Sequence, residues 1–281
     1  MSKWLSIYLE GDDLEEKCSL LFEFGVLGST ITPDGLACCY SPNENGAINT
    51  ELSEEILRLG LAINRIEQIE ETNWTQNCAA LFETVQVEAI KITPVKSFED
   101  GSKLTANPKS DLIIIPGTGF GTGHHPTTFN LLKLLQRPEL NSPPPKTVLD
   151  AGTGSGILAI GACRLFDCSV DAYEIDALAV ENAQENVALN KLEDKITLYC
   201  ESVHRSEQTY DLVIANLYAE LLELLCLHLV ERGKQSCHFL LSGIRADLAA
   251  GVIKKYESHG LQCSEKIISD GWAALMLKRT H

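Results

Sequence analysis

The spacing of apolar and polar residues predicts two successive patterns of secondary structure. In residues 1–70, alternation at every second position predicts strands, while apolar residues three or four positions apart predict helices. The expected order is strand, helix, strand, strand, helix, strand, which predicts a ferredoxin-like α+β domain over residues 1–70. The strands cover 3–9, 26–32, 36–41 and 62–69, the first helix carries Leu14, Cys18, Leu21 and Phe22, and the second helix covers Ser53–Leu59.

The second pattern is a regular alternation of strands and helices that follows a glycine-rich turn near residue 152. Such alternation predicts a parallel sheet with helices on both faces and ligands at the carboxyl ends of its strands. The expected strands lie at 169–174, 196–200, 210–215, 238–242, 261–268 and 272–278, and the expected helices at 177–190, 218–231 and 246–258.

The segment between the two patterns has weaker features. A short helix is expected from Thr72 to about Leu81, one strand across Val85–Thr93, and an exposed loop over 96–110. We therefore expect residues 71–95 to form a linker helix and a connection, and residues 96–281 to form the second domain.

The stretch from Val148 to Gly156 carries the first chemical signal. A buried strand runs into glycines at positions 152, 154 and 156, and a helical pattern begins at Ile157. Glycine lets a ligand approach the backbone closely, and the helix start offers unpaired N–H groups. A dinucleotide site would have its third glycine at position 157, so the spacing does not fit NAD. Asp150 puts a carboxylate beside the glycines, where it repels a pyrophosphate and attracts an ammonium or a sulfonium. The alternative is a glycine-rich turn that binds nothing.

Charge is concentrated near the N-terminus. The 281-residue chain has a formal net charge of -16, and residues 1–90 hold 16 acidic and 4 basic residues, a net charge of -12. This negative charge disfavours binding to nucleic acid. It indicates either a basic partner or a surface that only keeps the protein in solution. The ten cysteines show no Cys-x-x-Cys spacing and no His pair that completes a zinc site, and no apolar run approaches the roughly 20 residues of a membrane span. We therefore expect a protein of the reducing cytoplasm without a metal.

A glycine-rich segment leads into a helix at Pro126, which fits the first helical position. This puts Thr127 and Thr128 in the first turn, with hydroxyls free to meet a ligand. The alternative for Thr128 is an exposed first-turn residue. His124 and His125 are interpreted as a cap rather than as metal ligands, because adjacent side chains on a helix diverge.

Glu174 and Asn216 stand at the ends of two predicted strands. Glu174 lies 22 residues after Gly152, where a carboxylate can accept hydrogen bonds from both ribose hydroxyls of a nucleoside. Asp176 is expected to cap the next helix. Asn216 ends the strand that starts near residue 210, and its alternative role is turn chemistry alone.

Four strings of residues carry a family resemblance. The strings are Phe120-Gly121-Thr122-Gly123-His124-His125-Pro126-Thr127-Thr128, Asp150 to Gly156 continuing Ile157-Leu158-Ala159-Ile160, Ala215-Asn216-Leu217, and Leu241-Ser242-Gly243-Ile244. They resemble the PrmA family of class I S-adenosylmethionine-dependent enzymes, which methylate the large-subunit ribosomal protein eleven. The similarity runs nearly end to end, and it implies a Rossmann-like, seven-stranded, mostly parallel sheet behind an N-terminal ferredoxin-like domain.

The resemblance also implies the chemistry. S-adenosyl-L-methionine is the implied methyl donor, contacted at Thr128, Gly152, Gly154, Glu174 and Asn216, with Asn216 as the implied catalytic residue. The implied substrates are lysine ε-amines and the N-terminal α-amine of a basic ribosomal protein, which the acidic N-terminal domain docks. We expect a cytoplasmic monomer that contacts neither nucleic acid nor membrane directly.

Three positions depart from the family pattern. Ile115 stands where the family usually has Asp before Pro-Gly, and Cys78 stands where it has the second Trp of the linker helix. Glu174 replaces an Asp and keeps the charge. The departures therefore affect loop and linker contacts rather than the cofactor site.

Rival functions stay open at this point. One is a methyltransferase that acts on another basic protein or on a small molecule, and another is a non-catalytic cofactor-binding module. An adenine-N6 nucleic-acid methyltransferase is disfavoured, because Asn216-Leu217-Tyr218 lacks the Asn-Pro-Pro-aromatic string of such enzymes and the charge is wrong.

Overall fold

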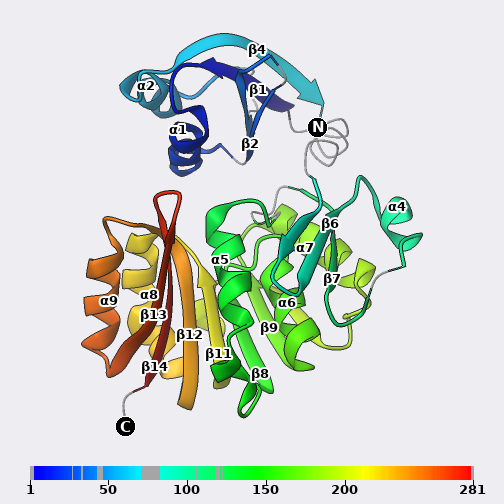
Figure 1. Cartoon of the computed structure of the whole chain (residues 1–281), viewed down its shortest axis with the longest axis vertical. Coiled ribbons are helices and arrows are strands. Elements are labelled where there is room, and N and C mark those ends of the chain that lie inside the picture. The colour runs from blue at the N-terminus through cyan, green and yellow to red at the C-terminus, as the bar shows by residue number, and fades with distance from the viewer. Residues whose placement is uncertain are drawn as a thin grey trace. The chain divides into compact units, whose positions relative to one another are not determined.

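The computed structural model describes residues 3–26, 28–32, 34–42, 47–70, 83–105, 107–117, 121 and 123–279. The chain divides into two compact units, Met1–Leu81 and Phe82–His281 (Figure 1). The helix expected over 72–81, with Cys78, lies outside the described residues. None of the described helices is both long and apolar enough to cross a membrane.

The N-terminal unit has the expected ferredoxin-like order of elements. Its strands pair only antiparallel, in the order β2-β3-β1-β4. Leu5, Ile7 and Leu9 alternate along one face of β1 and pack with Leu52 and Ile56 in the core of this unit. The elements are β1 (Lys3–Glu10), α1 (Leu14–Leu20), η1 (Leu21–Phe24), β2 (Gly28–Ile31), β3 (Ala37–Pro42), α2 (Thr50–Arg58) and β4 (Ala62–Glu70).

The second unit is built on a seven-stranded sheet in the order β10-β9-β8-β11-β12-β14-β13. The first five strands of this order pair in parallel, and β14 pairs antiparallel with both β12 and β13. The class I methyltransferase fold class is therefore confirmed. The strands are β8 (Thr147–Ala151), β9 (Ser169–Glu174), β10 (Ile196–Cys200), β11 (Tyr210–Asn216), β12 (Gly233–Arg245), β13 (Leu261–Ser269) and β14 (Trp272–Arg279).

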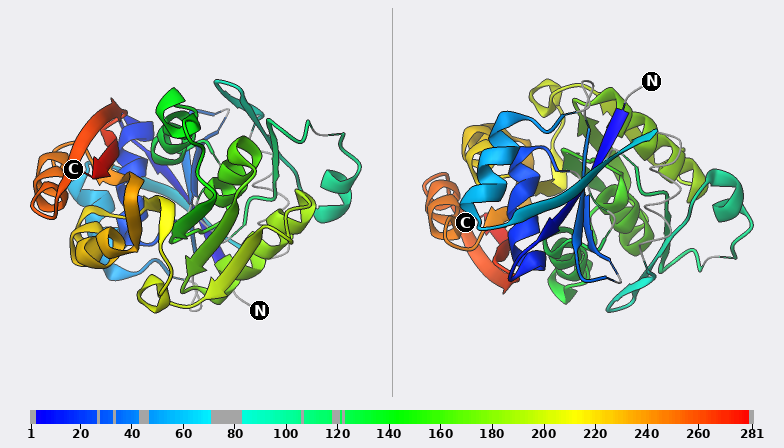
Figure 2. Two further views of the ribbon diagram at one scale, coloured as in Figure 1. Left: turned by 90° about the horizontal axis from the view of Figure 1, so that it is seen from below. Right: turned by 90° about the horizontal axis from the view of Figure 1, so that it is seen from above.

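Helices cover both faces of this sheet (Figures 1 and 2). Apolar side chains of α5, α6 and α7 form one core with the sheet, and those of α8 and α9 form a second core on the other face. The chain moves outward from β8 to β10 and then returns to β11 on the other side of β8, so the strand order reverses between β8 and β11. Ligands bind at such a reversal. The helices are α5 (Pro126–Leu135), α6 (Ile157–Phe166), α7 (Ala177–Leu189), α8 (Ala219–Arg232) and α9 (Ala249–Glu257).

A small three-stranded sheet precedes α5, and it corrects two expectations. The single strand expected over Val85–Thr93 is a hairpin of β5 (Val85–Val87) and β6 (Ile90–Pro94), because Glu88 takes a left-handed φ of 53° and turns the chain. The loop expected over 96–110 contains the short helix α4 (Phe98–Ser102), which the Ser97 hydroxyl caps. The third strand, β7 (Asp111–Ile114), pairs in parallel with β6.

Candidate functional site

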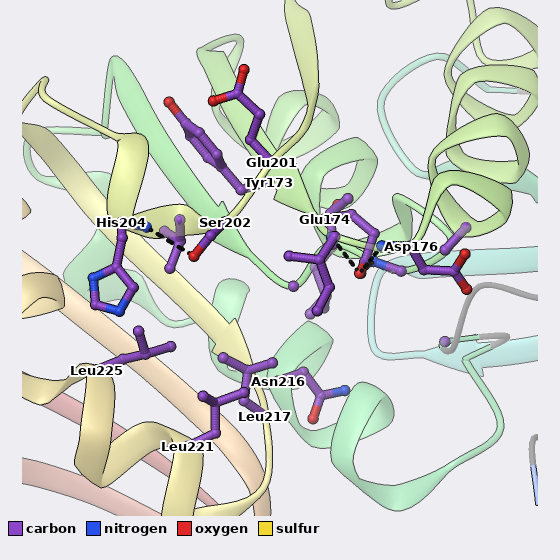
Figure 3. A pocket seen from close by; sticks show the side chains of 18 of the residues that line it. Tyr173, Glu174, Asp176, Glu201, Ser202, His204, Asn216, Leu217, Leu221 and Leu225 are labelled. Carbon is purple, nitrogen blue, oxygen red and sulfur yellow. Dashed lines mark hydrogen bonds between the residues drawn. The ribbon is translucent and has the colours of Figure 1, made fainter. Parts of the chain in front are cut away.

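A cavity of about 500 Å³ opens at the carboxyl ends of β8, β9 and β11. This volume lies within the range of about 300 to 1,000 Å³ that small-molecule sites occupy. All five residues assigned to a ligand from the sequence line it: Thr128, Gly152, Gly154, Glu174 and Asn216. Figure 3 shows Glu174 and Asn216 on the two strands that flank β8.

The glycine turn forms the floor of the cavity. Gly152, Gly154 and Gly156 have left-handed φ angles of 73°, 54° and 81°, which explains the spacing at every second position. The N–H groups of Gly152 and Thr153 both donate to the Tyr173 carbonyl, at 2.9 and 3.0 Å, and tie the turn to β9. A Cβ on Gly152 would stand 2.5 Å from Cδ2 of Leu217.

The Glu174 carboxylate accepts hydrogen bonds from three backbone N–H groups, one of them in the glycine turn. Its Oε2 accepts from Gly154 N at 3.1 Å, and its Oε1 accepts from Ile175 N at 2.8 Å and Asp176 N at 3.1 Å (Figure 3). An ionised carboxylate has about four acceptor sites, so it retains capacity for ribose hydroxyls. Asp176 caps α7 by accepting from Leu178 N at 3.0 Å, as expected.

Asn216 and Thr128 meet at the other side of the cavity. Asn216 Nδ2 donates to Thr128 Oγ1 at 3.3 Å, which fixes the orientation of the amide. The amide oxygen, Oδ1, is buried and has no hydrogen-bond partner among the residues that the structure describes. A buried acceptor without a donor costs free energy, so this atom is suited to a donor that arrives with a ligand.

The expectation that both threonine hydroxyls are free is wrong. Thr128 is fully buried and its hydroxyl accepts from Asn216, while the Thr127 hydroxyl lies 2.8 Å from Nδ1 of His125. His125 caps α5, since its Nδ1 also accepts from Thr127 N at 3.3 Å. Burial lowers the pKa of His125 to about 4, so the ring is neutral at pH 7. Within the described ranges, no cluster of His, Cys, Asp and Glu could hold a metal ion.

Asp150 does not face the ligand as the sequence suggested. It is fully buried at the end of β8, does not line the cavity, and accepts from the Thr153 hydroxyl at 2.6 Å. Burial raises its pKa to about 7. Asp150 therefore stabilises the glycine turn through its hydrogen bond with Thr153.

Sequence reasoning missed the part of the cavity lining that comes from the segment after β10 and from α8. Ser202, Val203 and His204 line it from the segment after β10, and Leu221 and Leu225 line it from α8 (Figure 3). These positions have no local sequence signal, because they read as a loop and an ordinary helix face.

Gly243 is a second missed residue, although its string contributed to the resemblance. It has a φ of 83°, and a Cβ there would stand 2.5 Å from the backbone oxygen of Leu217. Leu217 N also donates to Ser242 O at 2.9 Å. Gly243 thus allows the backbone that follows Asn216 to lie against β12.

The cavity is lined mainly by apolar residues, and its carboxylates are the source of its charge. Glu174, Asp176 and Glu201 contribute carboxylates, and no lysine or arginine lines it within the described part of the chain. Such a lining attracts a cation more than an anion.

Comparison with known proteins identifies similar chains over most of this length. A family model described as ribosomal protein L11 methyltransferase (PrmA) matches residues 12–280. A ribosomal protein L11 methyltransferase of Carboxydothermus hydrogenoformans is 35% identical over 237 residues, 83% of this chain and 76% of the relative. One from Bacillus cytotoxicus is 32% identical over 222 residues, 78% and 69% of the two chains. The crystal structure of a ribosomal protein L11 methylase from Lactobacillus delbrueckii subsp. bulgaricus matches 71% of this chain and all of its own, with a TM-score of 0.60 and 28% identity.

Proposed function

Because the chain belongs to the PrmA family of ribosomal protein L11 methyltransferases, we propose that it methylates lysine ε-amines and the N-terminal α-amine of L11. The enzyme class, the ribosomal protein substrate and the S-adenosylmethionine cofactor follow from the family. The choice of amines, the roles of individual residues and the way the substrate docks are our proposals. The observation that carries the proposed chemistry is the unpartnered amide oxygen of Asn216 beside the glycine turn.

The described cavity fits the cofactor. S-adenosylmethionine, when bound, supplies a methyl group on a positively charged sulfur and presents an ammonium, a carboxylate and ribose hydroxyls. The carboxylates of the lining suit the two positive charges, and Glu174 retains acceptor capacity for hydroxyls. The left-handed glycines bring bare backbone to the cavity floor. We propose that the residues holding the cofactor are Thr128, Gly152, Gly154, Glu174 and Asn216.

Asn216 is the proposed catalytic residue, because its free oxygen can accept an N–H from the substrate amine. An ammonium has no lone pair, so the amine must be neutral when it attacks, and at a reference pKa near 10.4 a lysine is mostly charged at pH 7. Transfer into a water-poor cavity lowers that pKa. The hydrogen bond to Thr128 fixes the orientation of the amide, so the amine meets an acceptor of fixed direction. Such positioning lowers the activation free energy by roughly several kcal/mol.

The N-terminal unit is the proposed docking surface for the basic substrate. Its arginines offer little free positive charge, since Arg58 pairs with Glu55 and Arg65 with Glu67. Opposite charges on enzyme and substrate speed encounter and select the partner. Because the substrate is a ribosomal protein, we expect the enzyme to act in the cytoplasm. Exposed acidic residues of this unit include Glu10, Asp12, Asp13, Asp34, Glu51, Glu54 and Glu67.

Incubation with radiolabelled S-adenosylmethionine and unmodified L11 tests the proposal. We expect label on L11, and mass spectrometry should locate it on lysine side chains and on the N-terminal amine. Other basic ribosomal proteins serve as controls and should remain unlabelled. Label on non-amine side chains, or equal labelling of every basic protein, would contradict the proposed specificity.

A further inference from the structure

Three asparagines on α7 and its C-cap hold the backbone of β7 and of Ile115, which follows it. Asn182, Asn186 and Asn190 are spaced four residues apart, so they share one face of the helix. All three are buried, with exposed fractions of 8%, 0% and 2%. A buried row of amides is unusual on a helix that packs against apolar core, and each amide needs partners.

The partners are backbone groups that a neighbouring strand would otherwise satisfy. Asn190 accepts from Ile113 N at 3.1 Å and donates to Ile113 O at 2.6 Å. Asn186 accepts from Ile115 N at 2.7 Å and donates to Ile115 O at 3.3 Å. Asn182 also donates to Ile115 O, at 3.0 Å.

These hydrogen bonds form a ladder between α7 and the extended segment, and the spacing of residues along the two elements allows it. Residues four apart rise about 6.0 Å along a helix, and residues two apart rise about 6.6 Å along a strand. Asn190 and Asn186 therefore match Ile113 and Ile115, while Asn182 shares the Ile115 carbonyl with Asn186. The Ile115 side chain takes no part in the ladder and packs with Val95, Ile113 and Leu189, so the departure from the family's Asp leaves these backbone contacts in place.

Asn186 differs from Asn190 in the partner of its third bond, because Asn190 Nδ2 donates back to the Asn186 carbonyl within α7, at 2.8 Å. Asn186 Nδ2 instead donates to the backbone oxygen of Ser155, in the glycine turn, at 2.9 Å. The Ser155 hydroxyl in turn donates to Gly121 O at 2.5 Å. Ile115 is therefore linked to the glycine turn through Asn186, and Gly121, which lines the cavity, is bonded to the turn directly through Ser155.

We propose that Asn186 is a positioning residue for cofactor binding, which holds the segment after β7 and the glycine turn at a fixed separation. This inference rests on the proposed function, because it assumes that the cavity binds S-adenosylmethionine. Asn186 touches neither the cavity nor the reacting atoms. Its loss should change the shape of the cofactor site without removing any group that contacts the substrate amine.

The test compares Asn186→Ala with the matched variant Asn190→Ala in the full chain. Each removes one buried amide that bonds both backbone groups of a single residue, so both should lower the melting temperature. Only Asn186→Ala is expected to weaken binding of S-adenosylhomocysteine, by about tenfold in calorimetry. It should raise the KM for S-adenosylmethionine similarly and keep kcat at saturating cofactor within about threefold. If Asn186→Ala does not fold, Ser155→Ala replaces it, since this variant deletes only the hydroxyl bond to Gly121, and the same rise in Kd is expected.

Each outcome decides the matter. Equal effects of Asn186→Ala and Asn190→Ala on cofactor affinity, or an unchanged Kd for folded Asn186→Ala, would overturn the positioning role. An unchanged Kd for Ser155→Ala, where it stands in, would do the same. Failure of the wild-type protein to bind S-adenosylhomocysteine would instead refute the proposed function.

Discussion

Replacing Asp150 by asparagine should change how the stability of the protein depends on pH. Asp150 is fully buried, and burial raises its pKa from 3.8 to about 7. Between these two values the folded protein keeps a proton on Asp150 that the unfolded chain has lost. Stability of the wild type therefore falls as pH rises from about 4 to 7 and then levels off, while the Asp150→Asn protein lacks this contribution.

The size of the effect follows from the shift. In the steep region the contribution changes by about 1.4 kcal/mol per pH unit, so the advantage of Asp150→Asn should grow by about 2.5 kcal/mol between pH 5 and pH 8. An asparagine oxygen can still accept the hydroxyl bond that Thr153 gives to Asp150. Any pH-independent effect of the substitution on the free energy of unfolding cancels, because only the change with pH is compared.

Urea unfolding followed by circular dichroism at pH 5, 6, 7 and 8 measures this difference at constant ionic strength. Asp211→Asn is the control, because hydrogen bonds from Lys234 and from the Lys146 and Thr147 backbone outweigh burial and lower the pKa of Asp211 below its usual value. Its effect on stability should stay constant across this range. A stability difference between wild type and Asp150→Asn that does not change from pH 5 to pH 8 would refute the reasoning.

Three further outcomes are expected. Asn216→Ala should lower kcat at saturating S-adenosylmethionine by about 100-fold, because a single positioned polar group is removed. Gly243→Ala should destabilise the protein by about 3 kcal/mol in urea unfolding and Gly152→Ala by only about 1, since the first Cβ meets backbone and the second meets a side chain that can move. Deletion of residues 1–70 should abolish methylation of L11 but leave cofactor affinity intact, and added salt should raise the KM for L11 in the intact enzyme.

Local signals in the sequence, together with the family resemblance, were sufficient for the fold class and for five of the residues that line the cavity. The glycines at positions 152, 154 and 156 need left-handed backbone, and strand-end polar residues such as Glu174 and Asn216 meet because parallel strands end at one edge. The hairpin at Glu88 escaped prediction, because a glutamate with a positive φ gives no turn signal where Gly or Asn would have given one.

Contacts between distant segments could not be predicted in the same way. Asn182, Asn186 and Asn190 look like the polar face of an exposed helix, and nothing in their spacing reveals that a strand lies against them. The burial of Asp150 beneath the turn was missed for a related reason. A carboxylate at a strand end can point toward the ligand or into the core, and only tertiary packing decides which.

The placement of Leu217 has a practical consequence for redesign of the enzyme. Its side chain fills the space left by the missing Cβ of Gly152, and its main chain fills the space left by that of Gly243. A bulkier or β-branched replacement side chain would therefore press on Gly152, while the main chain beside Gly243 leaves residue 217 no room to move away. Engineers who wish to admit a larger amine should therefore leave this leucine alone and shorten Leu221 or Leu225 of α8, which line the same cavity.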